Sequence, residues 1–256
     1  MGPLIKNAQV LVFDDASALE DFLLGKWTEM AGEAVARRGF FAAALSGGGT
    51  PVGFYRKLAR LSGKYGPVWK KTHIFMVDER MVPQDSKDSN FGMINETLLS
   101  GSPVPRENIH PIRTDELPEI CAERYAFELS GFFRLQKGEA PVFDLVLLGL
   151  GEDGHTASLF PGAGALKEKE RLAAAVHDEQ RHDRVTLTYS VLNSARNVIF
   201  LVTGEKKAAV LERVIEKNDP ALPASAVNPE NGMLLFLADA VAARRLPPGR
   251  CRKMQM

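Results

Sequence analysis

Cysteine is scarce in this sequence, which holds only Cys121 and Cys251, and the two form no C-x-x-C pair. The histidines stand at no spacing from either cysteine that is typical of a zinc site. A disulfide framework and a structural metal are therefore not expected, and no metal ion is assigned to the function. So few cysteines fit a reducing compartment, and we expect the protein to be cytoplasmic.

Neither sign of charge is in excess, because 32 basic residues balance 32 acidic ones. Proteins that bind nucleic acid usually carry a strongly basic surface, so nucleic acid is not an expected partner. No run of 18 apolar residues occurs, which argues against a membrane span. Asp14 and Asp15 interrupt the N-terminal region before an apolar segment forms, which argues against a signal peptide. An anionic ligand would have to be held by local groups.

What the sequence does contain is a regular alternation of short apolar runs with amphipathic segments. The apolar runs predict strands at 9–13, 40–45, 73–77, 143–148, 184–189, 197–202 and 233–239. The amphipathic segments predict helices at 17–38, 51–62, 90–100, 119–137 and 205–217. Near-continuous apolar strands separated by helices indicate an α/β fold, a mostly parallel sheet with helices on both faces.

No linker rich in glycine, serine or proline divides the chain, so residues 1–256 are expected to form a single α/β domain. The segment 162–184 is charged and poorly periodic, and we expect it to form a small additional β excursion from the sheet. Apolar helix faces in one sequence do not distinguish a core from an interface. The oligomeric state is therefore not predicted, and a monomer is the favoured expectation.

Four polar loops directly follow four of the predicted strands: 46–51, 78–83, 151–155 and 203–208. In an open parallel sheet, ligands bind beyond the carboxyl ends of the strands, where such loops converge. If the four strands are parallel, the four loops share one rim of the sheet. We therefore expect the functional site at this rim.

The first of these loops, SGGGTP, has two interpretations. Gly47, Gly48 and Gly49 let the backbone adopt positive φ and approach an anion. Thr50 can cap the next helix and Pro51 suits its first position, so that free N–H groups at the helix N-terminus face a phosphate. A plain glycine-rich turn explains the same residues equally well, and the Gly-Lys-Ser/Thr of a Walker A loop does not follow.

Charged residues stand in two of the other loops. Lys206 and Lys207 can bring a cation to the rim, although either lysine taken alone is typical of a solvated helix charge. Asp78, Glu79 and Arg80 put two carboxylates and a guanidinium at one strand end. Arg80 can contact an anionic substrate or a developing oxyanion, with Asp78 orienting it. The alternative is a turn that satisfies its charges internally.

Several residues near these loops have simpler expected roles. Arg184, at the start of the strand at 184–189, either faces the ligand or lies exposed, and Arg181 is expected to be exposed. Ser89 is expected to cap the helix that follows it. Four histidines lack the context of a loop at a strand's carboxyl end: His73, His110, His177 and His182.

The stretch GLGEDG, residues 149–154, matches the G-x-G-x-x-G pattern of dinucleotide-binding folds. That pattern needs a helix of several turns after its last glycine and an acidic residue at the end of the next strand. Here Pro161 and Gly162 stop a helix early, and the acidic residues downstream lie in a charged KEKE stretch. A nicotinamide cofactor is therefore not expected, and an oxidoreductase would need a longer helix at this place.

The same loop offers a different chemistry through Asp153 and His155, which are separated by Gly154. A histidine with an ordinary pKa of about 6.5 can take a proton from water at neutral pH. A nearby carboxylate can fix which ring nitrogen carries the proton. A lone histidine is more often structural, but the position at a strand's carboxyl end favours catalysis.

Four stretches, in this order, resemble the glucosamine-6-phosphate isomerase/6-phosphogluconolactonase family: SGGGTP, VDERMVPQDSKDSN, DLVLLGLGEDGHTASLFPG and RVTLTYSVLNSARNVIFLVTGEKKA. The resemblance is to its 6-phosphogluconolactonases and covers about residues 10–240, with GEDGHTASLFPG as its most specific part. It implies a Rossmann-like α/β fold shared with glucosamine-6-phosphate deaminase, ribose-5-phosphate isomerase and CoA-transferases.

The resemblance also implies hydrolysis of 6-phospho-D-glucono-1,5-lactone to 6-phosphogluconate, without a metal or other cofactor. The implied partner is this small sugar-phosphate lactone. By position, His155 would activate the water and Asp153 would support it. The implied substrate and phosphate contacts are Ser46, Gly47, Gly48, Gly49, Thr50, Asp78, Arg80, Arg184 and Lys207. Gly49 departs from the serine frequent in relatives, which removes a hydroxyl contact and keeps the backbone donors.

Two other functions stay open. The aminosugar-phosphate deaminases and isomerases resemble this chain at Asp-Gly-His, but they usually carry an acidic residue where Phe160 stands and an aromatic one where Arg80 stands. Without that carboxylate, a partner for proton transfer during ring opening is missing. A non-catalytic sensor of sugar phosphates would keep the loops without turnover, and the intact Asp153 and His155 argue against it.

Overall fold

The computed structural model describes residues 8–61, 66–178 and 182–254, and its centre is an eight-stranded sheet. All pairings in this sheet are parallel, and the strand order is β11-β1-β10-β9-β6-β2-β3-β5. The strands are β1 (Ala8–Phe13), β2 (Phe41–Leu45), β3 (Thr72–Met76), β5 (Ile109–His110), β6 (Leu145–Gly149), β9 (Asn197–Val202), β10 (Met233–Asp239) and β11 (Arg252–Lys253). The predicted mostly parallel α/β sheet is confirmed.

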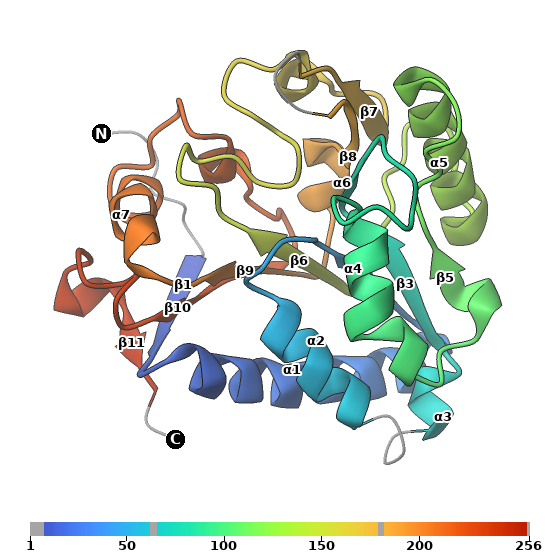
Figure 1. Ribbon diagram of the computed structural model, residues 1–256. Helices are drawn as coiled ribbons and strands as arrows, with labels where there is room; N and C mark the ends of the chain where they lie inside the picture. The colour runs from blue at the N-terminus through green and yellow to red at the C-terminus, as the bar shows by residue number, and fades with distance from the viewer. Residues whose placement is uncertain (1–7, 62–65, 179–181, 255–256) are drawn as a thin grey trace.

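Helices cover both faces of the sheet (Figure 1). Helices α1, α2 and α3 lie on one face, and α5, α6 and α7 lie on the other. Their bounds are α1 (Ala16–Arg38), α2 (Val52–Arg60), α3 (Gly66–Trp69), α4 (Asn90–Thr97), α5 (Pro118–Phe133), α6 (Tyr189–Leu192) and α7 (Ala208–Ile215). Within the described ranges, no helix has the length and apolar character that a membrane crossing requires.

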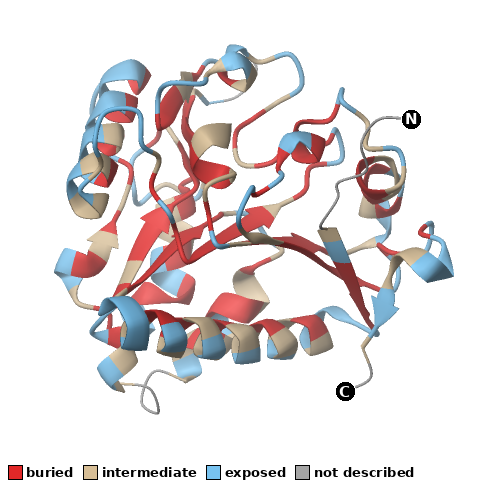
Figure 2. Ribbon diagram, turned by 180° about the vertical axis from the view of Figure 1, so that it is seen from behind, coloured by how far each residue is buried: buried red, intermediate tan, exposed pale blue. Residues whose placement is uncertain are grey.

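The longest helix, α1, shows how the sequence sets local structure. The Asp15 side chain accepts a hydrogen bond from the Ala18 N–H and caps the first turn. Gly39 ends the helix in the left-handed conformation, with φ of 84°, which glycine adopts without a steric penalty. Apolar residues at helical spacing form the face that packs on the sheet, seen as the red stripe in Figure 2: Leu19, Leu23, Trp27, Ala31 and Ala34.

A second, antiparallel sheet has the order β4-β8-β7 and lies above the main sheet. Its strands are β4 (Asp78–Arg80), β7 (Ala173–Val176) and β8 (Arg184–Leu187). The small β excursion expected at 162–184 therefore contains β7 and leads into β8, with 179–181, including Arg181, outside the described residues. The prediction that 78–83 is wholly loop is wrong, because its first residues form β4.

Val77 is the point at which the chain passes from one sheet to the other. Its N–H donates to the Leu45 carbonyl of β2 at 2.9 Å, and its carbonyl accepts the Leu187 N–H of β8 at 2.8 Å. A run of apolar residues cannot show which sheet a strand joins, because both sheets bury such residues. This crossing puts Asp78 at the corner between the two sheets.

The four predicted rim loops follow β3, β2, β6 and β9, which are consecutive strands in the sheet order. All four strands are parallel, so their carboxyl ends lie at the same edge. The prediction that the four loops share one rim is therefore confirmed.

Candidate active site

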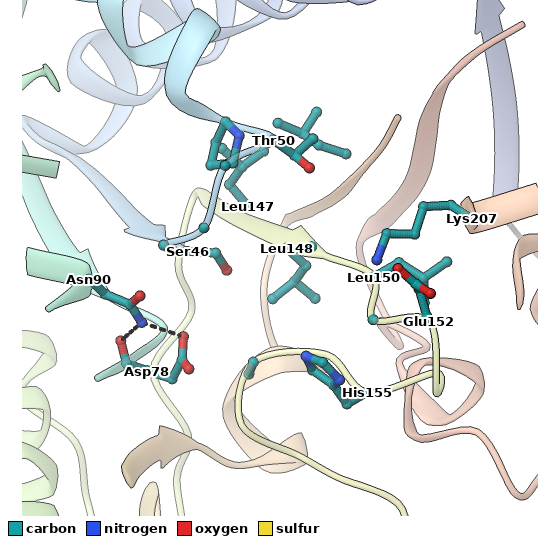
Figure 3. A pocket seen from close by; sticks show the side chains of 18 of the residues that line it. Ser46, Thr50, Asp78, Asn90, Leu147, Leu148, Leu150, Glu152, His155 and Lys207 are labelled. Atoms are coloured by element: carbon teal, nitrogen blue, oxygen red, sulfur yellow. Dashed lines mark hydrogen bonds between the residues drawn. The ribbon is translucent and has the colours of Figure 1, made fainter. Parts of the chain in front are cut away.

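A pocket of about 550 Å³ opens at this rim (Figure 3). All four loops contribute to its wall, together with the start of β8 and of α4. The structure brings together every residue that the sequence singled out for the site: Ser46, Gly47, Gly48, Gly49, Thr50, Asp78, Arg80, Asp153, His155, Arg184 and Lys207. Arg184, for which the sequence left two interpretations, lines the pocket.

The glycine loop presents backbone N–H groups to this pocket. Gly48 has φ of 88°, and none of the amides of Gly48, Gly49 and Thr50 donates to another group in the described part of the chain. An added Cβ at Gly48 or Gly49 would meet no atom within 4 Å, so both backbones face open space. The loop thus has free donors of the kind that bind an anion.

The expected helix cap in this loop is wrong. Helix α2 begins at Val52 with Pro51 as its N-cap residue, and no side chain, Thr50 included, caps it. Proline has no side-chain acceptor, and the turn places it one position earlier than expected. The Thr50 hydroxyl is therefore not engaged at the helix start.

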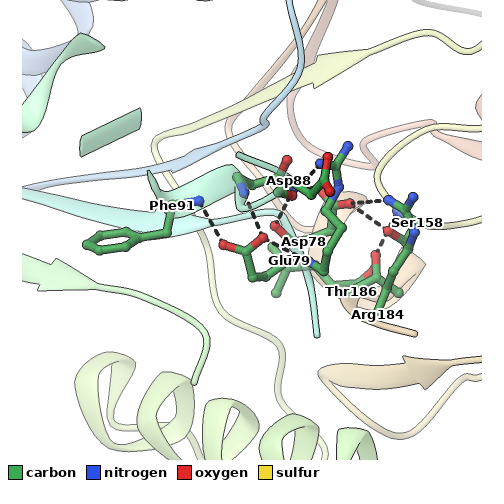
Figure 4. Close-up of polar contacts among 10 residues, drawn as sticks. Asp78, Glu79, Asp88, Phe91, Ser158, Arg184 and Thr186 are labelled. Atoms are coloured by element: carbon green, nitrogen blue, oxygen red, sulfur yellow. Dashed lines mark hydrogen bonds and ion pairs between the residues drawn. The ribbon is translucent and has the colours of Figure 1, made fainter. Parts of the chain in front are cut away.

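The carboxylate of Asp78 is buried at the corner between the sheets and has three partners (Figure 4). Oδ2 accepts a hydrogen bond from the Ser158 hydroxyl at 2.6 Å, and Oδ1 accepts one from the Asn90 side chain at 3.3 Å. Nη1 of Arg184 lies 3.9 Å from Oδ2. The hypothesis that Asp78 orients Arg80 is wrong, because this carboxylate faces Arg184.

Arg80 is held in a different way. Its Nη1 donates to the Asp88 carbonyl at 2.6 Å, and its Nε is buried without a hydrogen-bond partner among the described residues. A buried N–H donor without a partner costs free energy, of the order of 1–3 kcal/mol, unless a ligand or water accepts from it. Arg80 lines the pocket, so its guanidinium brings a positive charge to the pocket wall.

Glu79 has a structural role beside these residues. Its fully buried carboxylate accepts from the backbone N–H groups of Asn90 and Phe91, each at 2.7 Å, and from the Ser89 hydroxyl at 3.1 Å. Burial raises the pKa of the Glu79 carboxyl, and the backbone donors partly oppose this shift. Ser89 caps α4 as predicted, since its hydroxyl accepts the Gly92 N–H. This cluster fixes the start of α4 against β4.

His155 and Asp153 form a hydrogen-bonded pair at the other side of the pocket. Nδ1 of His155 lies 2.5 Å from Oδ1 of Asp153, which also accepts the His155 backbone N–H at 3.1 Å. Burial disfavours the charged form of Asp153, but these hydrogen bonds and the imidazole outweigh it and lower the pKa of the carboxyl. The carboxylate on Nδ1 leaves Nε2 as the ring nitrogen available to a ligand.

Two glycines make room for this pair. A Cβ on Gly151 would lie 2.1 Å from Nδ1 of His155 and 2.5 Å from Oδ1 of Asp153. Gly154 has φ of 85°, and a Cβ there would lie 2.6 Å from the side chain of Leu222. The sequence pattern that resembles a dinucleotide fingerprint therefore serves the packing of the loop that carries His155 and Asp153.

Lys207 lines the pocket and is half-buried, whereas its neighbour Lys206 is exposed and does not line it. Lys207 lies in the 3-10 turn Glu205–Lys207 after β9 and makes no ion pair with another described residue. In Figure 3 its side chain points into the pocket from the side opposite Asp78. In the described ranges, no group of three or more histidine, cysteine, aspartate or glutamate residues is arranged to hold a metal ion.

Three further residues at the site were not predicted to have a role. Asn90 and Ser158 hold Asp78, and the ring of Phe160 contacts His155. In the sequence, Asn90 is assigned only to the start of a helix. Phe160 is noted only because the deaminases usually carry an acidic residue at that position. Ser158 and Phe160 lie in the specific stretch GEDGHTASLFPG, which is the signal that could have indicated them.

The fold and the pocket define a class of protein: a Rossmann-like α/β protein with cationic side chains and a histidine–aspartate pair on one rim of its sheet. The chain belongs to the family described as glucosamine-6-phosphate isomerases/6-phosphogluconolactonase, whose model matches residues 14–236. The predicted family and fold are confirmed.

Individual relatives agree with this assignment. A 6-phosphogluconolactonase of Rattus norvegicus is 43% identical over 212 residues, which cover 82% of each chain. One of Synechocystis sp. is 42% identical over 219 residues and covers 84% of this chain and 89% of the relative. The solved structure of 6-phosphogluconolactonase from Trypanosoma brucei has a TM-score of 0.82 at 31% identity, covering 94% of this chain and 99% of its own.

Proposed function

We propose that this protein is a 6-phosphogluconolactonase, which hydrolyses 6-phospho-D-glucono-1,5-lactone to 6-phospho-D-gluconate, the second step of the oxidative pentose phosphate pathway. The observation that carries the proposal is the hydrogen-bonded pair of His155 and Asp153 in one pocket with the glycine loop and Lys207. The relatives at 43% and 42% identity bear this name and indicate the substrate.

His155 acts as the general base. The carboxylate of Asp153 holds the proton on Nδ1, so Nε2 accepts a proton from a water molecule. The oxygen of that water forms a bond to the lactone carbonyl carbon, and the carbonyl oxygen becomes an oxyanion. When the oxyanion collapses, the bond from this carbon to the ring oxygen breaks, and the imidazolium returns its proton to that oxygen.

The phosphate and the oxyanion need different partners. We assign the phosphate to the free amides of the glycine loop and to Lys207, because both are donors without described partners. Arg80 also lines the pocket, where its guanidinium can contact the oxyanion. Arg184, held beside Asp78, adds a second cation there.

A cytoplasmic location and a monomeric state belong to the same proposal. Both cysteines, Cys121 and Cys251, are free, which fits a reducing compartment.

The test is hydrolysis of freshly generated lactone, followed as formation of 6-phosphogluconate and compared with spontaneous hydrolysis. We expect wild type to exceed the background by far and His155→Ala to lose at least about a hundredfold in kcat. His177→Ala is the matched control, because His177 also pairs with acidic side chains but lies outside the pocket. Near-normal turnover in His155→Ala would refute the assignment of the base.

Phe160 argues against an aminosugar-phosphate deaminase. The ring of Phe160 lies beside His155, at the place where a carboxylate would be needed for proton transfer during ring opening. Release of ammonia from glucosamine 6-phosphate would instead show that the protein is a deaminase. Tight binding of a sugar phosphate without turnover would instead support a sensor.

A further inference from the structure

Phe160 contacts two functional groups of the pocket at once. The ring centroids of Phe160 and His155 are 4.6 Å apart, and the two ring planes are inclined by 46°. The guanidinium carbon of Arg184 lies 5.2 Å from the centroid of the same ring. Phe160 is half-buried, and its one ring contacts both the proposed base and a cation of the pocket wall.

Arg184 and Ser158 both contact the carboxylate of Asp78 (Figure 4). Arg184, whose guanidinium lies over the ring of Phe160, has its Nη1 3.9 Å from Oδ2 of Asp78. The same oxygen accepts the Ser158 hydroxyl at 2.6 Å, and Ser158 precedes Phe160 by two positions on the loop that also carries His155. Ser158 and Phe160, on the loop that carries His155, are therefore linked to one buried carboxylate, the first directly and the second through Arg184.

An aromatic ring has a specific effect at this place. Its face attracts a cation, which here is the guanidinium of Arg184 at all times and the imidazolium of His155 during the reaction. The ring itself carries no charge, so it forms an ion pair with neither of these two cations. The other charged groups near His155 are Asp153 and Glu152 on its own loop and Lys207 on the turn after β9.

We propose that Phe160 is a positioning residue that fixes the imidazole of His155 and the guanidinium of Arg184 against one uncharged ring. The inference rests on the proposed function for what the two groups do, but its geometry stands without it. A substitution that removes the ring lets both groups move, so the proton transfer and the substrate contact weaken together.

A purely structural role for Phe160 makes a different prediction, because its ring also packs against the hydrophobic core. A residue that only fills space affects the fraction of folded protein. It does not change kcat and KM of the folded enzyme together.

The first test compares Phe160→Leu with Phe160→Tyr, which keeps the ring. We expect Phe160→Leu to lower kcat/KM by about tenfold to a hundredfold, with kcat falling and KM rising, while Phe160→Tyr stays within about threefold of wild type. Phe22→Leu is the matched control, because Phe22 is a half-buried phenylalanine on α1 outside the pocket. Equal activity of Phe160→Leu and wild type would overturn the proposal, as would equal losses in the leucine and tyrosine variants.

The second test needs no substrate. Phe160→Glu and Phe160→Gln have similar shapes and differ in charge, and the pKa of His155 is measured in both by NMR titration, with His155→Ala identifying its signal. A carboxylate beside the imidazole favours the charged form, so we expect the pKa to be about one unit higher in the glutamate variant. Equal pKa values would overturn the placement of Phe160. If wild type does not hydrolyse the lactone, the proposed function is wrong. The comparison of the two pKa values still tests whether the side chain at 160 lies beside His155.

Discussion

Oδ1 of Asp153 accepts two hydrogen bonds from the same residue, one from Nδ1 of His155 at 2.5 Å and one from its backbone N–H at 3.1 Å. The carboxylate therefore holds both the ring and the backbone of His155. Because these bonds form only in the folded loop and lower the pKa of Asp153, they stabilise the protein above about pH 4, the ordinary range of an aspartate. This contribution is lost as the pH falls through the lowered pKa.

Asp153→Asn should lower kcat by at least about a hundredfold at neutral pH. The asparagine amide can donate to Nδ1 and so favours the tautomer that carries its proton on Nε2, which cannot accept a proton from water. Initial rates of lactone hydrolysis above background measure the effect. Asp115→Asn is the control, because Asp115 pairs with Arg113 on the surface. A loss of the same size in both variants would contradict the role of Asp153.

Gly151→Ala should lower activity strongly, because the added methyl group would overlap both His155 and Asp153. The methyl group cannot be accommodated without displacing the pair, and a displacement near 1 Å can cost about a hundredfold in rate. Gly164→Ala is the matched control, since a Cβ there meets no atom within 4 Å. Activity is measured together with the melting temperature, and an active Gly151→Ala enzyme would contradict the packing.

Lys207→Ala should raise KM by about tenfold to a hundredfold, because the variant loses one hydrogen bond from a charged donor to the phosphate. Lys206→Ala should leave KM unchanged, because Lys206 is exposed and does not line the pocket. The effect of Lys207 should also shrink at high salt. Steady-state kinetics of both variants at two salt concentrations give the comparison, and similar KM values for the two would exclude Lys207 as a phosphate contact.

The stability of the protein should fall between pH 6.5 and pH 4, partly because of His73. Burial, with smaller effects from His110 and Lys71, lowers the pKa of His73 to about 4. Nδ1 of His73 also lies 3.1 Å from Nε2 of His110, so the folded state resists a proton that the unfolded state accepts. Urea midpoints at pH 7 and pH 5 should differ more for wild type than for His73→Gln. An equal difference in the two proteins would rule His73 out as the cause.

The meeting of the four loops at one rim could be predicted from the sequence because it depends only on the direction of the strands. A loop after a parallel strand always reaches the carboxyl edge, whatever the order of the strands. The order itself, with β6 between β9 and β2, depends on helix crossovers that apolar runs do not encode. Strands as short as β4, β5 and β11 have too few residues for a period to be recognised.

The partners of Asp78 could not be predicted for a related reason. Asn90 lies 12 residues away in the chain and Ser158 lies 80 residues away, so these contacts exist only after the sheet has formed. Residue type alone gives Asn90 and Ser158 many possible partners. His155 and Asp153 were identifiable because their contact is local, two residues apart in one loop.

The two strands that border the main sheet, β11 and β5, have only two residues each. An edge strand has unpaired backbone N–H and C=O groups with which a strand of another chain can pair, and a longer edge strand offers more of them. Here both edge strands are short. In β11 the residues are the exposed Arg252 and Lys253, whose positive charges repel a second copy. These short edge strands therefore disfavour edge-to-edge pairing between the sheets of two molecules, and with it fibrous or amorphous aggregation.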